Sequence, residues 1–379
     1  MINIVDKRKC VGCSACVMRC PTKCIALQAD DEGFLYPIVN QDLCIDCGLC
    51  DRVCPVINQF TPKRPLKCYA SKSLSLDILR RSSSGGIFGI ISELILSEGG
   101  VVFGAAFAPD MSVYHCAVES LADLPNIQRS KYSQSIIGST YVDAEIELKA
   151  GRKVLFSGTP CQISGFRHFL KKDYPNLLTI DVACHAVPSP RVWQTFIESK
   201  KDLDFNSVNF RDKKNGWLQY GFSLSHNNEE VFYQMSSDNA FMRGFLKDLY
   251  SRPSCSMCPA KEGKSGSDLT LADFWGIWDV LPGFDFRNGA SAVIINTSRG
   301  QKIYDKILAC LECLPVEYED IIRCNPALVK SAVYPRQRKE FWSKFPYEGI
   351  GCIDIIVDSM QPSFVKRTAY FILRKLRQK

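Results

Sequence analysis

The sequence CVGCSACVMRCP at residues 10–21 recurs as CIDCGLCDRVCP at residues 44–55, with 34 residues between equivalent positions. Both stretches have the spacing Cys-x2-Cys-x2-Cys-x3-Cys-Pro, in which three closely spaced thiolates can hold three corners of an iron–sulfur cube. The fourth corner needs a ligand from farther away, and in two-cluster ferredoxins the fourth cysteine of each run ligates the other cluster. We therefore predict two 4Fe-4S clusters, one held by Cys10, Cys13, Cys16 and Cys54, and the other by Cys44, Cys47, Cys50 and Cys20.

Residues 1–58 are expected to form a small ferredoxin-like domain around these two clusters. Between the runs, residues 24–27 and 34–38 are apolar and flank an acidic stretch that ends in Gly33, a pattern that predicts a hairpin. A domain of this size buries little apolar surface, and the clusters would supply the missing cross-links. A pair of zinc sites is the alternative, but zinc modules usually have paired CxxC knuckles. Cys24 belongs to neither run and is expected to be a small packed residue.

The composition of the whole chain is that of an ordinary globular protein. The 379 residues are 46% hydrophobic and 23% charged, and nine of the 19 cysteines lie in the first 54 residues. The formal net charge is +7, but six positive charges belong to the last fourteen residues, so we expect no nucleic-acid partner. We see no secretory signal and no apolar run of the ~18 residues that a spanning helix needs, and we expect a cytoplasmic protein.

The chain continues for about 320 residues beyond the ferredoxin region. Residues 59–66 contain two prolines and two cations without periodicity, which indicates a linker. Strand and helix patterns follow over residues 67–150 and 151–330, and they predict the two parts of one mixed α/β domain. The fold class is thus α+β/α/β, with residues 331–379 as a C-terminal extension.

One candidate ligand site lies at the start of a predicted helix. Ser82, Ser83, Ser84, Gly85 and Gly86 precede the apolar helical stretch 87–96. Hydroxyls and free backbone N–H groups at a helix N-terminus suit a nucleotide pyrophosphate or another cofactor phosphate. A simple serine N-cap is an equally good interpretation.

Two further sites are predicted where strands end. Residues 153–158 form an apolar strand that leads through Thr159 and Pro160 into a helix, and the strand 178–183 ends in Cys184 and His185. Turns of this kind lie at the carboxyl edge of a sheet, where ligands bind in open α/β folds.

A CxxC pair lies in a loop between two prolines, at Cys255 and Cys258. With Cys161 and Cys184 these residues make four thiolates, the number that a third 4Fe-4S cluster requires. A two-cysteine redox site or half of a zinc site is the alternative. The rival pair Cys310 and Cys313 is expected to pack within the helical stretch 301–311. The isolated cysteines are expected in the core; they are Cys68, Cys116, Cys324 and Cys352.

A further candidate site for a ligand consists of charged and aromatic residues at positions 210–213, Trp217 and positions 268–276. Side chains of this kind at strand ends can hold an isoalloxazine ring and its ribityl tail. A charged surface or the edge of the core is the alternative.

Together these motifs resemble the coenzyme F420 hydrogenase/dehydrogenase β-subunit family over roughly residues 1–300. The motifs that carry the resemblance are the ferredoxin runs, Ser83-Ser84-Gly85-Gly86, residues 131–135, residues 158–162, Cys184-His185, residues 210–213, Cys255-x2-Cys258 and residues 273–276. The family includes subunits of deazaflavin-reducing hydrogenases and formate dehydrogenases, and single-chain reductases of tetrapyrroles.

The resemblance implies that the α/β part is a flavin-binding domain with FAD beside a third 4Fe-4S cluster, held by Cys161, Cys184, Cys255 and Cys258. It also implies which residues contact the flavin or its phosphates: Ser83, Ser84, Gly85, Gly86, Lys131, Gln134, Ser135, Thr159 and Pro160. Alanine stands at Ala186 and Ala272 where the family motif has glycine, so substrate identity is the property that transfers least.

The predicted clusters and the implied FAD site together indicate an oxygen-sensitive iron–sulfur flavoprotein oxidoreductase. Clusters pass single electrons, whereas most organic substrates take two, and FAD would convert between the two. His185 is the candidate proton donor because it neighbours a predicted ligand. The alternative is an electron-transfer subunit that has no substrate of its own and serves a larger hydrogenase or dehydrogenase. The expected partners are a small-molecule substrate and an electron donor or acceptor, such as a ferredoxin or a partner oxidoreductase subunit.

The C-terminal segment has a separate pattern. Val365, Ala369, Ile372, Leu373 and Leu376 form an apolar stripe on a basic helix predicted over residues 363–377. Such a helix could contact an anionic membrane surface peripherally, or pack on the protein or on a partner.

Overall fold

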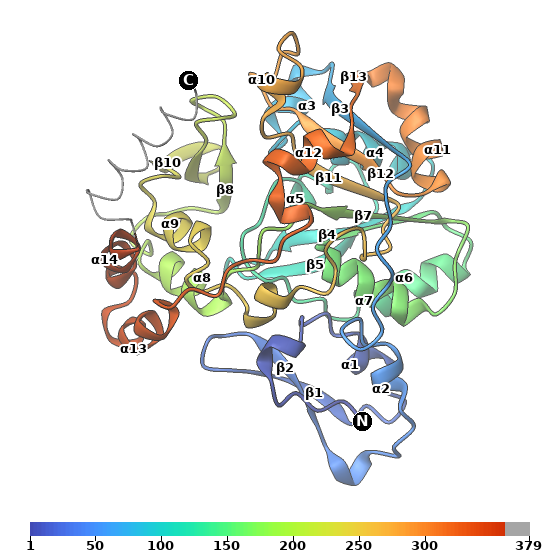
Figure 1. Ribbon diagram of the computed structural model, residues 1–379, viewed down its shortest axis with the longest axis vertical. Helices are drawn as coiled ribbons and strands as arrows, with labels where there is room; N and C mark the ends of the chain where they lie inside the picture. Colours follow the sequence, from blue (N-terminus) through green and yellow to red (C-terminus); the bar gives the residue numbers. More distant parts are fainter. Residues whose placement is uncertain (361–379) are drawn as a thin grey trace, which may run out of the picture.

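The structure, a computed structural model, describes residues 1–360 and consists of a cysteine-rich N-terminal domain, a large mixed sheet and a smaller lobe (Figure 1). The linker between α2 and β3 runs as an extended segment along the sheet region, and the N-terminal domain lies at one end of the molecule (Figure 1). The basic helix predicted over residues 363–377 lies outside the described residues. In the described part of the chain, no helix combines the length and apolar character needed to cross a bilayer.

The N-terminal domain confirms the predicted hairpin and the duplication. Its strands pair antiparallel, with Ile25 opposite Val39. Equivalent positions of the two cysteine runs share the left-handed backbone conformation: φ is 70° at Gly12 and 49° at Asp46, and 62° at Ser14 and 66° at Gly48. The elements of the domain are η1 (Lys7–Lys9), α1 (Ala15–Arg19), β1 (Ile25–Ala29), β2 (Leu35–Val39), η2 (Gln41–Leu43) and α2 (Leu49–Arg52).

The large sheet has eight strands in the order β13-β3-β12-β11-β7-β6-β4-β5. Strands β11, β7, β6 and β4 run parallel to one another at its centre, and antiparallel pairs extend both edges. The strands are β3 (Lys67–Ser73), β4 (Val101–Phe107), β5 (Val113–Val118), β6 (Val154–Gly158), β7 (Leu177–Val182), β11 (Leu269–Asp273), β12 (Ser291–Ile295) and β13 (Leu311–Pro315). The sheet joins β3 from the N-terminal part to β12 and β13 from the C-terminal part, so the two predicted parts share one core.

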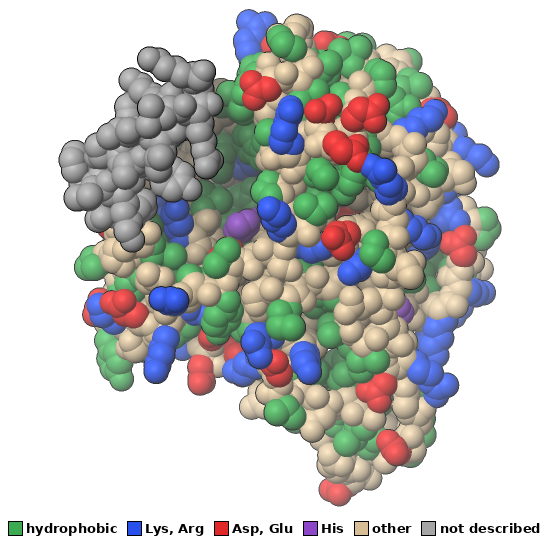
Figure 2. Space-filling view, viewed as in Figure 1, with side chains coloured by type: hydrophobic (Ala, Val, Ile, Leu, Met, Phe, Trp, Pro, Cys, Tyr) green, Lys and Arg blue, Asp and Glu red, His purple; other side chains and the backbone are tan. Residues whose placement is uncertain are grey.

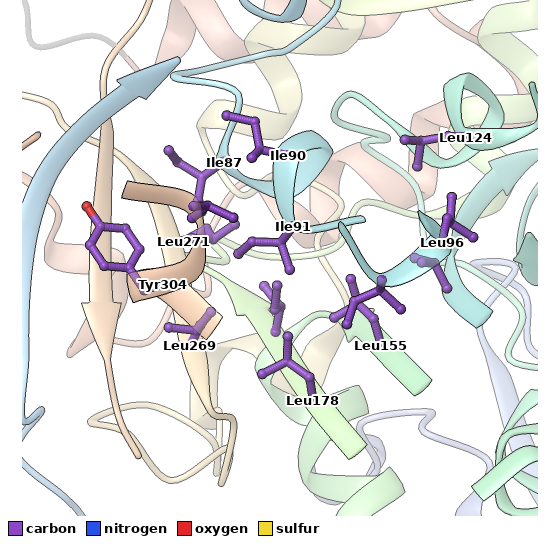
Figure 3. Packing of buried hydrophobic residues seen from close by; sticks show 14 of the residues in the cluster. Ile87, Ile90, Ile91, Leu96, Leu124, Leu155, Leu178, Leu269, Leu271 and Tyr304 are labelled. Carbon is purple, nitrogen blue, oxygen red and sulfur yellow. The ribbon is translucent and has the colours of Figure 1, made fainter. Parts of the chain in front are cut away.

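Helices cover both faces of this sheet, and each has an apolar side that explains its position. On one face α4 and α11 pack on the central strands, with Ile91, Leu155 and Leu178 among the buried contacts (Figure 3). On the other face α6 and α7 bury Tyr141 and Phe166 against β6 and then contact the N-terminal domain. Helices α10 and α12 cover the remaining part. The helices are α3 (Leu76–Arg80), α4 (Ile87–Ser97), α5 (Leu124–Ile127), α6 (Thr140–Lys149), α7 (Pro160–Leu170), α10 (Ile277–Val280), α11 (Ser298–Ile307), η4 (Leu308–Cys310), α12 (Tyr318–Cys324) and η5 (Pro326–Leu328).

The smaller lobe has its own aromatic core beside the sheet (Figure 1). Trp193 and Phe241 are fully buried there, with ring centroids 5.2 Å apart. The lobe contains α8 (Pro190–Glu198), β8 (Ser207–Asp212), β9 (Gly221–His226), β10 (Glu229–Met235), α9 (Ala240–Leu246), η3 (Pro253–Met257), α13 (Arg338–Glu348) and α14 (Gly351–Ser359).

Two predictions about cysteines need correction. The stretch 301–311 is not one helix: it leaves α11 through η4 at Cys310 and enters β13, so Cys313 lies on a strand. The strand forms because residues 311–315 pair with β3 at the edge of the sheet, a tertiary contact that local periodicity does not reveal. Among the cysteines expected in the core, Cys68 and Cys352 are buried, whereas Cys116 and Cys324 are partly exposed.

Candidate functional site

The first cysteine set, Cys10, Cys13, Cys16 and Cys54, lines one hollow of about 400 Å³ that opens to solvent. The fourth member comes from the other run, as the spacing predicted. Burial raises the pKa of Cys16 to about 12, and the neighbouring thiols of Cys10 and Cys54 add to this. A buried thiol with so high a pKa needs a bound cation to hold it as a thiolate.

The second cysteine set, Cys20, Cys44, Cys47 and Cys50, lines a separate hollow of about 340 Å³. Cys24 also lines this hollow, and its sulfur lies 3.4 Å from the Cys20 sulfur. The prediction that Cys24 is a buried residue is confirmed, since it is 5% exposed. The structure adds that it lies directly against a predicted ligand.

The two hollows fit a group larger than a single ion. In the described residues, no three His, Cys, Asp or Glu side chains converge on a point in the manner of a mononuclear metal site. The thiols of each set instead surround a volume, and all the cysteines of residues 1–360 are free of disulfides. Four thiols around an open volume match the ligands of a 4Fe-4S cluster.

The third cysteine set, Cys161, Cys184, Cys255 and Cys258, is brought together from three distant segments. Cys161 lies in the first turn of α7, Cys184 follows β7, and the other two lie in or directly after η3. Burial and the neighbouring thiols raise the pKa of Cys161 to about 11 and that of Cys255 to about 12. Burial also raises the pKa of Cys184, with the charges of the other three members acting in the same direction.

The sheet explains why this third set assembles. Gly158 at the end of β6 lies opposite Asp181 near the end of β7, so the turns that carry Cys161 and Cys184 lie side by side at the carboxyl edge. The η3 loop is fixed there by backbone contacts: the Arg252 N–H donates to the Val187 carbonyl at 2.9 Å, and the Val187 N–H lies 3.5 Å from the Cys255 sulfur.

The third set lies next to the first. Gly165, one turn after Cys161 on α7, lies so close to Cys13 that an added Cβ atom would fall 2.8 Å from the Cys13 sulfur. The buried Tyr141 lies near both Cys13 and Cys161, and its hydroxyl donates to the Gln162 carbonyl at 2.7 Å. The cysteine sets therefore follow one another in the order second, first, third.

The serine and glycine loop before α4 is a second place where a ligand could bind. The N-cap of α4 is Gly86, with φ of 88°, and no side chain caps the helix, so the alternative of a serine N-cap is wrong. The Ser83 hydroxyl accepts from the Ser130 N–H at 2.9 Å, and the Ser84 hydroxyl donates to the Ala290 carbonyl at 2.9 Å. The first turn of this helix therefore has no side-chain cap in the described residues, an arrangement that suits an anion.

Two lysines lie beside this loop. Lys131 directly follows the serine that contacts the loop, and its ammonium group donates to the carbonyls of Gln128 and Arg129. Burial, together with the charge of Arg129, lowers the pKa of Lys131 to about 7. The ammonium group of Lys213 donates to the Ser84 carbonyl at 3.4 Å. Figure 2 shows a hollow between the small lobe and the sheet region, in which basic side chains and a histidine are visible.

A hydrogen-bonded network links other candidate residues at the carboxyl edge. The Ser135 hydroxyl lies 2.8 Å from His115 Nδ1 and accepts from the Gln162 amide at 2.8 Å. Gln162 in turn accepts from the Thr159 N–H at 2.9 Å and completes a capping box at the start of α7. Burial lowers the pKa of His115 to about 4, so its imidazole is neutral at physiological pH.

Gln134 does not belong to this network, because its hydrogen-bond partners are Val11 and Arg252. Its amide donates to the Val11 carbonyl at 3.3 Å, and its oxygen accepts from Arg252 at 2.7 Å. Both partners belong to the contact with the N-terminal domain, so this side chain is engaged between the domains.

His185 lies beside the third set and contacts a carboxylate. Its Nε2 atom is 2.8 Å from Asp248 Oδ1, and its side chain is 40% exposed. Asp248 is fixed from the other side, where its second oxygen accepts from the Val333 N–H at 2.9 Å.

Sequence reasoning missed the buried carboxyl of Asp181. It lies on a wall of a hollow of about 420 Å³ that also borders Cys184 and Pro160, and its Oδ1 atom has no hydrogen-bond partner in the described residues. Burial raises the pKa of Asp181 to about 6. Its acidic residue type at the end of an otherwise apolar strand was the only available signal.

The charged and aromatic motifs at 210–217 and 268–276 meet in one packed group. Arg211 pairs with Asp273 at 2.7 Å, and the Trp217 ring stacks on Trp275 with centroids 4.9 Å apart. These packed residues fit the alternative interpretation, in which the two motifs form the edge of the core. The Nε and Nη2 atoms of the buried Arg211 have no hydrogen-bond partner in the described residues.

The architecture and the two ferredoxin hollows define the class: this is an iron–sulfur electron-transfer protein of the oxidoreductase type. Residues 3–61 match the 4Fe-4S dicluster domain, which supports two 4Fe-4S clusters. Residues 151–317 match the C-terminal region of the beta subunit of coenzyme F420 hydrogenase/dehydrogenase. This match is to the family that the resemblance of the motifs predicted, and it covers less than half of the chain.

Curated relatives match separate parts of the chain. The coenzyme F420-dependent sulfite reductase of Methanocaldococcus jannaschii is 27% identical over 173 residues, which are 44% of this chain and 26% of the relative. Pyruvate synthase subunit PorD of Thermotoga maritima is 40% identical over 55 residues, which are 14% of this chain and 52% of that protein. The chain thus spans only a quarter to a half of the length of these relatives.

A solved structure of the F420-reducing NiFe hydrogenase complex from Methanosarcina barkeri contains a similar chain. The match has a TM-score of 0.48 and 18% identity, and it covers 72% of this chain and 97% of that one.

Proposed function

We propose that this protein is an oxidoreductase that passes single electrons through three 4Fe-4S clusters to or from FAD, and exchanges two electrons with a small molecule. Bound FAD would supply the conversion between one-electron and two-electron chemistry. The same order of sites serves electron flow in either direction.

The observation that carries the proposal is the uninterrupted order of the cysteine sets. The second and first sets share the duplicated runs, and the first set contacts the third through Gly165. The third set lies at the carboxyl edge of the sheet, beside Thr159 and Pro160. A chain of sites that leads from the surface of one domain to the ligand-binding edge of another suits electron transfer toward a bound cofactor.

The residues that would hold FAD lie around that edge. The loop from Ser83 to Gly86 and the uncapped start of α4 would accept its phosphates, with Lys131 as the cation. Ser135, Thr159 and Pro160 would line the part of the FAD site nearest the third set. Gln134 would contact FAD from its place between the two domains.

His185 is our candidate for the proton donor. It follows the predicted ligand Cys184 directly, and the contact with Asp248 fixes the position of its ring. Through this contact Asp248 would orient the imidazole ring.

The alternative function, an electron-transfer subunit without its own substrate, is favoured by the surface around the second set. Leu43 and Ile45, on either side of Cys44, are 55% and 65% exposed, and Ile45 borders the second hollow. Exposed apolar side chains at the mouth of a redox site suit docking of a donor or acceptor protein. This surface serves either function as the external point of electron exchange.

Anaerobic purification with iron, sulfide and flavin quantified tests the proposal. We expect about twelve irons and one flavin per chain, whereas about eight irons would show that the α/β domain holds no cluster. Turnover of an organic acceptor by the single chain would exclude the subunit alternative, and activity that requires a second subunit would support it. Colourless protein with zinc and without iron would refute both.

A further inference from the structure

Arg252 is the most deeply buried arginine among residues 1–360 and lies between the N-terminal domain and the sheet domain. It is 1% exposed. Its Nε atom donates to the Cys10 carbonyl at 2.8 Å, and its Nη2 atom donates to the Leu35 carbonyl at 2.9 Å. The same Nη2 atom lies 3.6 Å from the Cys10 sulfur.

The charge of this guanidinium has no carboxylate partner in the described residues. Its remaining hydrogen bond goes to the neutral Gln134 amide, and its flanks lie against the rings of Phe34 and Tyr36, at 5.2 and 4.4 Å. The nearby carboxylates of the hairpin are engaged elsewhere: Asp30 pairs with Lys7 at 2.7 Å, and Glu32 pairs with Arg338. A buried charge without a counter-charge is costly, so an anionic group is expected beside it.

Two predicted clusters flank Arg252. The carbonyl of Cys10 in the first set accepts the hydrogen bond from Arg252 Nε, and Cys255 of the third set follows Arg252 by three residues, in η3. The Cys255 N–H donates to the Arg252 carbonyl at 2.9 Å, which holds the third set against this residue. Clusters with four thiolate ligands carry net negative charge, and their potentials depend on net charge, hydrogen bonds to sulfur and exposure to solvent.

We propose that Arg252 is the shared counter-ion of the first and third cysteine sets when these hold clusters, and that it makes the cluster of the first set easier to reduce than that of the second. For the third set the inference rests on the proposed function; for the first set it does not. In one transfer a single electron leaves one cluster and reduces the next, with no bond or proton changed. Arg252 favours the state with the electron on the first set because that state carries more negative charge.

The internal repeat supplies the contrast. Cys44 is the equivalent of Cys10 in the second run, and no hydrogen bond from an arginine reaches it within the described residues. Arg52 donates to the Cys47 carbonyl at 2.6 Å, but this contact lies in an exposed position, so water and salt screen its charge. Two runs with the same spacing are thus given different electrostatic surroundings by tertiary structure.

Redox titration of the full-length, iron-loaded chain, followed by electron paramagnetic resonance, tests the inference. The Arg252→Met and Arg252→Gln variants remove the charge, and Arg252→Lys keeps it. Arg191→Met is the matched control, because Arg191 donates to the Asp31 carbonyl of the same hairpin at 2.5 Å without contacting a cysteine. The cluster of the second set is an internal reference in every variant.

We expect both uncharged variants to weaken one-electron reduction of the first cluster about tenfold or more, equivalent to ~59 mV, with the second cluster unchanged. Arg252→Lys and Arg191→Met should stay within about twofold of the wild type. Unchanged potentials in the uncharged variants, or an equal shift in Arg191→Met, would overturn the inference. If the uncharged variants fail to load iron, retention of iron and potential by Arg252→Lys supports it, and failure of Arg252→Lys refutes it.

The iron content separates this result from the proposed function. About eight irons with a shifted first cluster would support the role of Arg252 at the first set and refute the third cluster. About twelve irons with unshifted potentials would support the third cluster and refute the role of Arg252 at the first set.

Discussion

Gly165 of α7 lies against Cys13 of the N-terminal domain, so closely that a Cβ atom on Gly165 would fall 2.7 Å from the Cys13 Cβ atom and 2.8 Å from its sulfur. This contact brings the first cysteine set to the helix that carries Cys161. Through this contact the N-terminal domain and the sheet domain, which are joined by a linker, place their predicted clusters next to one another in space.

The first prediction follows from this contact. Gly165→Ala should displace Cys13 or α7 and lower stability by about 1–3 kcal/mol, as overpacking of a core does. We expect reduced iron content and a lower unfolding temperature. Gly351→Ala is the control, because Gly351 also lies in a helix but has open space around its Cβ position. Equal behaviour of the two variants would show that the contact is not tight.

The second prediction concerns the third set. Replacing any one of Cys161, Cys184, Cys255 and Cys258 by serine should lower the iron content from about twelve to about eight per chain, because each supplies one corner of the predicted cluster. Cys310→Ser should leave it unchanged, since Cys310 is exposed and outside all three sets. Iron analysis and sulfide analysis of anaerobically purified variants decide this, and a variant with unchanged iron excludes that residue as a ligand.

The third prediction is a pH dependence of flavin binding through Lys131. Its pKa is lowered to about 7 by burial, so its ammonium form predominates below that pH and disappears above it. If Lys131 contacts a phosphate of FAD, affinity should fall as pH rises above about 7. Fluorescence titration of the flavin-free protein on both sides of this pKa measures the effect. Lys131→Met should bind more weakly and lose this pH dependence; a variant with the wild-type profile would exclude Lys131 from the contact.

The fourth prediction concerns the stability effect of Asp181. Burial raises its pKa to about 6 in the folded chain, above the value of ~3.9 in an unfolded chain. The folded state therefore binds more protons between these values, and the free energy of unfolding falls as pH rises through this window. Above the folded-state pKa the full cost remains, about 3 kcal/mol for a shift of about two units.

Asp181→Asn removes the charge and should raise the unfolding temperature more at about pH 8 than at about pH 5, which lie on either side of the folded-state pKa. Thermal unfolding at the two values measures the difference. Asp77→Asn changes an 82% exposed carboxylate and serves as the control. An equal effect of Asp181→Asn at both values would mean that Asp181 has an ordinary pKa.

Local sequence was sufficient for features that depend on short-range geometry. The cysteine spacing predicted the duplicated domain and the crossing of Cys20 and Cys54, because the ligand set is encoded within two short runs. The turn and helix at residues 158–170 were also predictable, since Thr159 and Gln162 form a capping box within four residues. Cys313 was misplaced because its strand exists only through pairing with β3.

The order of amino acids alone was enough to predict the two ferredoxin cysteine sets, the hairpin between them and the alternation of strands and helices that follows. Two relationships emerged only from the folded chain: Gly165 contacts Cys13, and Arg252 lies beside Cys10 without a carboxylate partner in the described residues. The difference arises because thiol spacing and helix capping act over a few residues. The surroundings of a buried charge instead depend on segments far apart in the chain, and Cys10 and Arg252 are 242 residues apart.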